Sequence, residues 1–228
     1  MMPTTQPSES SSVVDTDEMV LIHTFLRREF RLAAGVLRRV RPGDTARAAD
    51  VADHLDFLDR FLHHHHTIED ELLWPVLLER VPEELAPIVH LMETQHAGVE
   101  GTLATIGELL PRWRATADAG LGERLAGEYD VLYVALAEHL DAEEQRLLPI
   151  AARALSQAEW DALGEEGRSR GNRREGPLVL GMFAYEGDPA VFTRMLGGAP
   201  RPVRAVLTRL GRRAFRTHAR LIHGTPTP

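Results

Sequence analysis

Four long stretches of the chain place apolar residues at the spacing of an α-helix, and only short breaks separate them. The breaks contain proline and glycine, as at Pro42-Gly43 and Gly120. We expect helices over about residues 17–40, 45–80, 85–116 and 121–155. Four helices joined by such short connections favour an all-α fold, an up-down-up-down four-helix bundle with a C-terminal helical extension.

The two ends of the chain differ in composition from these stretches. Residues 1–16 are rich in Ser, Thr and Pro, which predicts a disordered N-terminal tail. Residues 156–228 form an Arg-rich extension with a short helix from Ser156, a Gly/Arg-rich hinge at 167–176 and a helix at 203–222. From Arg168 onward there are 12 Arg and three acidic residues, although the whole chain carries a net charge of −8. We therefore predict a tail, a helical domain over residues 17–155, and a basic extension.

The absence of cysteine narrows the chemistry. It excludes disulfides, thiolate zinc sites, iron–sulfur clusters and cysteine nucleophiles, and leaves His, Asp and Glu as metal ligands. The sequence has no apolar run of the roughly 20 residues that a membrane span needs. Its start has neither the basic nor the apolar region of a secretory signal, so a cytoplasmic protein is expected.

A motif of histidine and glutamate occurs twice, near the ends of the second and fourth stretches. His65 is followed by Glu69 and His139 by Glu143, and in each copy a proline stands six residues after the glutamate. Residues four apart on a helix lie on one face, about one turn apart. An imidazole and a carboxylate at this spacing can reach the same metal ion, and the second carboxylate oxygen can reach another ion beside it.

The first and third stretches each contribute one matching histidine. His65 follows His23 by 42 residues, and His139 follows His96 by 43. The chain therefore consists of two similar helical hairpins, each with one His and one His-x-x-x-Glu. Together they offer four imidazoles and two carboxylates, a set that suits two metal ions bridged by the two glutamates.

These residues resemble the hemerythrin (HHE cation-binding) family over about residues 17–155. The run Glu69-Asp70-Glu71-Leu72-Leu73-Trp74-Pro75 is also typical of its bacterial members. The resemblance implies a non-haem di-iron centre with two iron ions and an oxo or hydroxo bridge. It further implies one set of metal ligands: His23 and His65 on one iron, His96 and His139 on the other, and Glu69 and Glu143 between them.

The sequence departs from the oxygen-carrying hemerythrins on the third and fourth helices. Those proteins have His-x-x-x-His on helix three, whereas the neighbours of His96 at this spacing are Met92 and Glu100. Their helix-four carboxylate is an Asp five residues after the His, whereas Glu143 follows at four. One imidazole is therefore missing or replaced by an oxygen donor such as Glu100, which would favour the ferric state and weaken reversible oxygen binding.

Several other residues have a plainer explanation. Four consecutive histidines (63 to 66) cannot all face the core, so one or two are expected inside; His65 fits the repeat, and His66, one turn before Asp70, is the alternative. His96 also lies in a Glu-x-x-His unit of ferritin-like type, but no second unit occurs. Four histidines are expected outside the metal site: His54, His90, His218 and His223. Tyr129 and Tyr133 are expected as core residues. Three acids are expected to be solvated: Glu71, Asp141 and Glu144.

The last helix is basic and amphipathic. Its predicted apolar face includes Val203, Val206, Leu210 and Leu221, with arginines mostly outside that face. Such a helix can bind an anionic membrane or nucleic acid. We favour docking of the apolar face on the bundle, with the arginines against its acidic surface, so that nucleic acid is not an expected partner. The extension also offers a surface for self-association.

Three functions agree with this reading. The first is a protein that binds or senses oxygen, iron or a redox species such as nitric oxide or peroxide. The second is a di-iron oxidase or oxygenase that acts on a small molecule, and the third is a structural bundle that holds zinc or manganese. No site for an organic co-substrate is evident, so binding or sensing ranks first. The expected partner is dioxygen or another small diatomic or peroxide ligand.

Overall fold

The structure, a computed structural model, describes residues 13–228. These residues form helices and short connections, with no strand among them, so the predicted all-helical class is confirmed. The elements are α1 (Asp17–Arg38), α2 (Thr45–Ile68), the π-helical turn η1 (Glu69–Leu73), α3 (Trp74–Arg80), α4 (Pro82–Thr116), α5 (Ala119–Ala142), the π-helical turn η2 (Glu143–Leu147), α6 (Leu148–Ala154), α7 (Gln157–Arg170), α8 (Gly176–Glu186), α9 (Pro189–Met195) and α10 (Arg201–His223).

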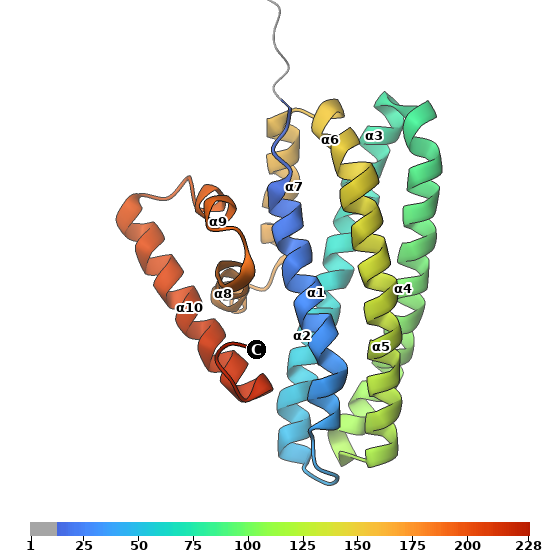
Figure 1. Ribbon diagram of the computed structural model, residues 1–228, viewed down its shortest axis with the longest axis vertical. Helices are drawn as coiled ribbons and strands as arrows, with labels where there is room; N and C mark the ends of the chain where they lie inside the picture. The colour runs from blue at the N-terminus through green and yellow to red at the C-terminus, as the bar shows by residue number, and fades with distance from the viewer. Residues whose placement is uncertain (1–12) are drawn as a thin grey trace, which may run out of the picture.

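Four long helical stretches lie side by side and match the four predicted from the apolar spacing (Figure 1). They are α1, α2–η1–α3, α4 and α5–η2–α6. The first stretch packs against α2 and α5, and α4 packs against the same two helices. At two of the breaks a side chain caps the next helix: Asp44 accepts a hydrogen bond from the Arg47 N–H, and Asp118 accepts one from the Leu121 N–H. At the third, Val81, α4 begins with Pro82 and has no side-chain cap.

Two apolar cores lie one after the other along these stretches. One contains residues such as Phe25, Leu55 and Tyr129, and the other contains residues such as Leu77 and Met92. The predicted metal ligands on α2–η1, α4 and α5–η2 fall between the segments that form these cores. The cores therefore hold the polar side chains away from water.

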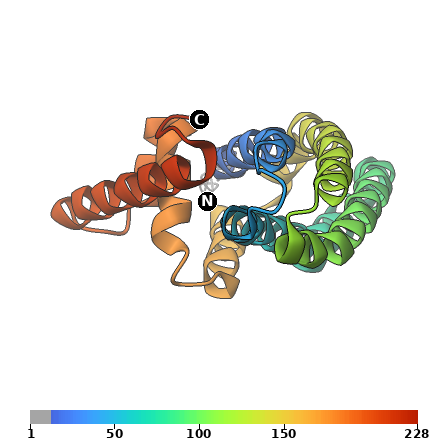
Figure 2. The same ribbon diagram turned by 90° about the horizontal axis from the view of Figure 1, so that it is seen from below.

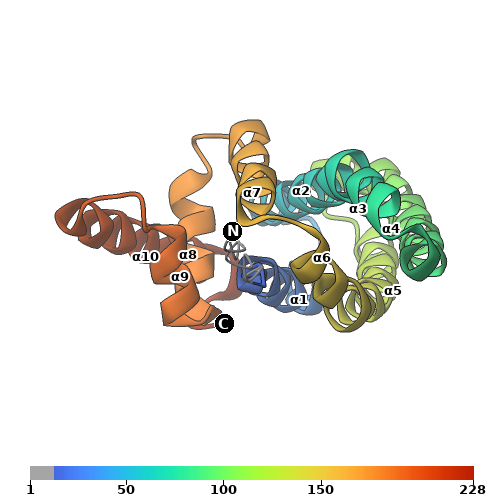
Figure 3. The ribbon, with the colours of Figure 1, turned by 90° about the horizontal axis from the view of Figure 1, so that it is seen from above.

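The C-terminal segment, residues 156–228, lies beside α1 and α2. Views from below (Figure 2) and from above (Figure 3) show α8, α9 and α10 on one side of the four stretches. Its first helix, α7, begins with a capping box in which Ser156 and Glu159 exchange hydrogen bonds. The last helix packs mainly on α8, and only its C-terminal end contacts α2. No helix within residues 13–228 is long and apolar enough to cross a membrane.

The predicted docking of α10 is wrong in its face and its partner. Val206 and Leu210 are 57% and 53% exposed, while Phe215, Ala219 and Ile222 are buried. Between α8 and α10 the contact is close at Gly181 and Gly211, since a Cβ on Gly181 would lie 2.1 Å from the Gly211 carbonyl oxygen. Small residues therefore set the docking face. None of the α10 arginines pairs with a carboxylate within the described part of the chain.

The predicted N-terminal tail lies outside the described residues as far as residue 12. Its last part packs on the C-terminal side of α6. Val14 is 4% exposed and its N–H donates to the Ala152 carbonyl, and the Asp15 N–H donates to Gln157. Residues 14–16 therefore belong to the packed structure.

Candidate metal centre

The two repeated motifs adopt the same unusual backbone. In η1 the Trp74 N–H bonds to the Glu69 carbonyl five residues earlier, and in η2 the Leu148 N–H bonds to the Glu143 carbonyl in the same way. One residue after each π-helical turn stands the motif's proline, which has no N–H to continue the α-helical ladder. Single π-helical turns of this kind are frequent at functional sites, and here each one begins at the motif's glutamate.

One group of ligand atoms joins α1 to the ends of α2 and α5. His23 Nε2 lies 3.3 Å from Glu143 Oε2, and His65 Nε2 lies 3.2 Å from Glu69 Oε1. All four side chains are buried, and each offers an atom within 4.8 Å of the others. This group contains two imidazoles and two carboxylates.

A second group lies next to the first and shares Glu69 with it. Glu69 Oε2 is 3.6 Å from His96 Nε2, and His96 Nε2 is 3.1 Å from His139 Nε2. His66 completes the group, with its ring stacked on that of His96 at a centroid distance of 4.0 Å. Glu69 therefore presents one oxygen to each group, as a bridging carboxylate does.

The outer nitrogens of three histidines are held by hydrogen-bond partners. His23 Nδ1 lies 2.8 Å from Glu144 Oε1, and His96 Nδ1 lies 2.9 Å from Asp70 Oδ1. His139 Nδ1 lies 3.4 Å from Gln95 Oε1. With Nδ1–H donated outward, each ring directs the lone pair of Nε2 into the site, as in carboxylate–histidine–metal triads.

The inner nitrogens and oxygens have no such partners. Hydrogen-bond partners are lacking for the Nε2 atoms of His23 and His65, both ring nitrogens of His66, and all four carboxylate oxygens of Glu69 and Glu143. An unsatisfied buried polar group costs about 1–3 kcal/mol, and more when it is charged. So many of them in one place indicate that the site is built for cations.

The pKa values of these buried side chains also agree with a cation site. Burial lowers the pKa of His65 to about 3, and the pKa of His139 is also lowered to about 3, first by burial. Burial also raises the pKa of Glu69 well above its usual value, and the neighbouring Glu143 carboxylate adds to this rise. Burial would raise the pKa of Glu143 too, but His23 and His139 hold it at about 2. Metal ligation requires neutral imidazoles and deprotonated carboxylates, which the low pKa values of His65, His139 and Glu143 favour. A cation would offset the burial and the repulsion that raise the pKa of Glu69.

All six residues predicted as ligands lie in these two groups: His23, His65, Glu69, His96, His139 and Glu143. The structure adds His66, which sequence reasoning treated as the alternative to His65; both are buried, while His63 and His64 are exposed. Glu100 does not lie in either group, because it pairs with the exposed His63 at 3.1 Å. The fifth imidazole therefore comes from the second stretch.

Two carboxylates beside the ligands were also missed. Glu144 was expected to be solvated, yet it is half-buried against His23 and Arg27. Asp70 likewise binds the outer nitrogen of His96 and accepts a hydrogen bond from Trp74 Nε1. The signal for both is in the repeat, because each acid directly follows its motif's glutamate. Glu71 and Asp141 are exposed and pair with arginines, as expected for solvated acids.

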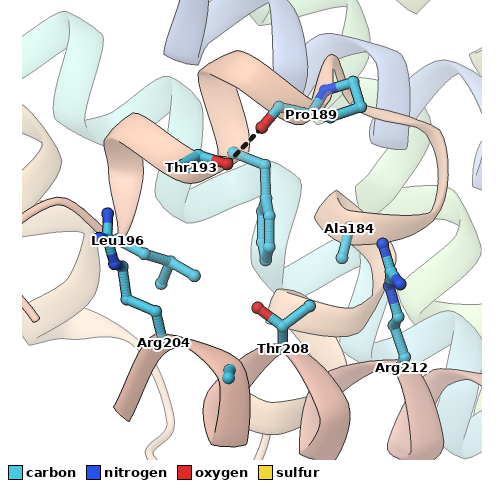
Figure 4. Close-up of a pocket in the computed structure, with 10 residues that line it drawn as sticks. Ala184, Pro189, Thr193, Leu196, Arg204, Thr208 and Arg212 are labelled. Carbon is cyan, nitrogen blue, oxygen red and sulfur yellow. Dashed lines mark hydrogen bonds between the residues drawn. The ribbon is translucent and has the colours of Figure 1, made fainter. Parts of the chain in front are cut away.

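An open cavity lies apart from these two groups. A cavity of about 200 Å³ lies between α8, α9 and α10, lined by residues such as Phe192, Thr193 and Thr208 (Figure 4). The Thr193 hydroxyl already donates to the Pro189 carbonyl at 2.6 Å. None of the residues that line this cavity belongs to the two histidine–glutamate groups.

A family model of the hemerythrin HHE cation-binding domain matches residues 14–151. The chain belongs to this family. The HHE region includes α1 to α5, both π-helical turns and most of α6, and thus every residue of the two groups. No curated protein and no solved structure shows a significant match to the chain.

Proposed function

We propose that this HHE protein holds a non-haem di-iron centre in an up-down-up-down four-helix bundle and binds or senses a small redox-active ligand. Dioxygen, nitric oxide and peroxide are the ligands of this class. One observation carries the proposal: two buried groups of ligand atoms share Glu69, which offers a different oxygen to each. Two adjacent ions bridged by a carboxylate are the arrangement that this geometry supports.

The donor set fits iron. Five imidazoles and two carboxylates, with no thiolate, suit iron, manganese or zinc, and the family resemblance favours iron among them. Two cations would also supply the partners that the inner nitrogens and carboxylate oxygens lack. Non-haem iron in such a site supplies reversible redox chemistry toward small oxidants.

The chain's own residues prepare the site in three ways. Glu144 and Asp70 hold the outer nitrogens of His23 and His96, which fixes the orientation of both rings. The two apolar cores exclude bulk water. The low pKa values of His65 and His139 keep both rings neutral at neutral pH, so that one nitrogen of each ring has a free lone pair.

The two groups differ in their imidazole content, and both leave room for an exogenous molecule. The group around His96 contains three imidazoles, whereas the group around His23 and His65 contains only two. Each group offers four side chains, so a six-coordinate iron ion in either of them would keep a position for an exogenous molecule. The ligand side chains are at most 9% exposed, so a molecule that reaches this position must be small. In this set His66, and not the carboxylate of Glu100, supplies the fifth imidazole, which the third helix lacks. The expected weakening of reversible oxygen binding by an additional carboxylate therefore does not apply.

The test is metal analysis of protein purified without oxygen, followed by absorption spectra before and after air is admitted. About two irons per chain, with charge-transfer bands that appear in air and fade when oxygen is removed, would support reversible binding. Bands that form once and decay irreversibly would replace this proposal with a di-iron oxidase. Zinc alone, with no spectral response, would remove the redox function.

A further inference from the structure

A second cluster of metal-ligating side chains lies where the end of α10 meets α1 and α2. Glu29 Oε2 is 3.4 Å from His54 Nε2 and 3.4 Å from His223 Nε2. The three side chains are 0%, 1% and 4% exposed, respectively. Two consecutive helices, α1 and α2, and the distant α10 thus bring one carboxylate and two imidazoles together in the interior. None of these residues belongs to the di-iron groups.

The ligand atoms that face one another in this cluster make no hydrogen bonds. Glu29 Oε2, His54 Nε2 and both nitrogens of His223 lack hydrogen-bond partners. Their spacing suits a single ion, because a tetrahedral ion with bonds of about 2.0–2.1 Å separates its ligand atoms by about 3.3–3.4 Å. Two imidazoles and one carboxylate are also a common set of protein ligands for Zn²⁺ and for Fe²⁺.

The surroundings hold these ligands in the state that a cation needs. His218 Nε2 lies 3.0 Å from His54 Nδ1. When His54 donates Nδ1–H to His218, its Nε2 lone pair faces Glu29. Arg28 contacts the other oxygen of Glu29 and lies 3.6 Å from Glu186, so its charge is shared with a second carboxylate. Burial would raise the pKa of Glu29, but His223, His54 and Arg28 hold it well below its usual value.

We propose that Glu29, His54 and His223 form a mononuclear site for a divalent transition-metal ion, Zn²⁺ or Fe²⁺, with its fourth position open to water. The ion would join α10 to α1 and α2. Arg47 already fixes the end of α10 there by donating to the Leu221 and Ile222 carbonyls, next to His223. This site is independent of the di-iron centre.

The test weakens the first centre and measures the zinc that the second site adds. Full-length Glu69→Ala protein is saturated with zinc, freed of excess by gel filtration, and compared with Glu69→Ala/His223→Ala and with the control Glu69→Ala/His90→Ala, in which the changed His90 is exposed. We expect the first and third proteins to hold about one zinc per chain more than the second, because the residues that Glu69→Ala leaves at the first centre are the same in all three. Equal zinc in all three, or none in Glu69→Ala itself, would overturn the proposal.

Two further measurements apply if His223→Ala perturbs folding. Glu29→Gln keeps the side chain's size and its contact with Arg28, and it should also lose the zinc; retention would count against the site. Cobalt(II) added to Glu69→Ala should give the visible ligand-field bands of a four-coordinate ion. Their absence, with helix content unchanged by circular dichroism, would mean that the cluster is only a polar contact between helices.

Discussion

The two halves of the helical repeat differ in what they give to the centre. The first half, α1 to α3, supplies His65 and His66 in succession, whereas the second half supplies His139 followed by Leu140. Each half's outer carboxylate serves the other half: Asp70 holds His96, and Glu144 holds His23. Because each half supplies ligands and also orients a ligand of the other half, neither hairpin can form the centre alone. The one unmatched histidine makes the two metal positions unequal.

The largest effect should come from the carboxylate that both groups share. Glu69→Ala removes an oxygen from each group, so we expect the chain to lose most of about two bound ions. Glu143→Ala should also lose metal, although the His66 group keeps Glu69 and is expected to retain more. Metal content after gel filtration measures both. Two ions retained in either variant would remove that glutamate from the bridge.

The asymmetry between the halves can be tested by making them alike. His66→Leu gives the first half the residue that stands at Leu140 in the second, and we expect about one ion of two to be lost or bound at least tenfold more weakly. His64→Ala, beside it but exposed, is the matched control and should keep its metal. Full metal content with Leu at 66 would make His66 a packing residue and not a ligand.

Loss of the carboxylates that orient histidines of the opposite half should lower metal binding less than loss of a ligand. Glu144→Gln and Asp70→Asn keep the shape of each side chain but weaken the hold on His23 and His96. Changes of this kind lower metal affinity by about 10–100-fold. Competition with a chelator of known affinity measures the change, and Glu71→Gln, on the exposed side of the same turn, is the control. Unchanged affinity in both variants would mean that the rings are oriented by packing alone.

The sequence was sufficient for the four long stretches and for most of the centre, but it did not predict α8 and α9, and the predicted hinge at 167–176 begins inside α7. Apolar spacing and capping residues are local, so the long stretches match their predicted bounds closely, and the spacing of His23, His65, His96 and His139 predicted which residues meet. His66 was left open because the repeat has only one counterpart for two histidines. The second half offers no histidine at Leu140, so the pattern gave no reason to place both His65 and His66 inside.

The docking of α10 could not be predicted from apolar spacing within the helix. Its largest apolar side chains suggested one face, yet the close approach of Gly181 and Gly211 determines another. Such an approach depends on two small residues from different helices, and no periodicity within α10 reveals it. The cluster of Glu29, His54 and His223 depends on the same docking, which explains why these residues looked unrelated in the sequence.

The smallest effect concerns a hydrogen bond that joins the two halves. The Tyr129 hydroxyl on α5 donates to Asp59 on α2 at 2.8 Å, which confirms that this tyrosine is a core residue with a bonded hydroxyl. Burial raises the pKa of Asp59 to about 7, against a smaller lowering by Tyr129. An unfolded Asp titrates near pH 3.9, so the folded chain binds this proton more tightly. Its contribution to the free energy of unfolding is therefore present at low pH and is lost as the pH rises from about 4 to about 7.

Asp59→Asn keeps an acceptor for Tyr129 and removes the buried charge. We expect the variant to be more stable than the original protein by about 1–2 kcal/mol at pH 8, with the difference shrinking as the pH falls to 5. Urea unfolding at both pH values measures this difference in the free energy of unfolding. The titration of the metal ligands cancels in the difference, because both proteins contain the same ligands. Asp56→Asn, one turn away and 59% exposed, should show a much smaller pH dependence, because its charge makes only a minor contribution to the raised pKa of Asp59. A difference that stays constant between pH 5 and pH 8 would mean that Asp59 is ionised throughout and that water reaches the junction between the halves.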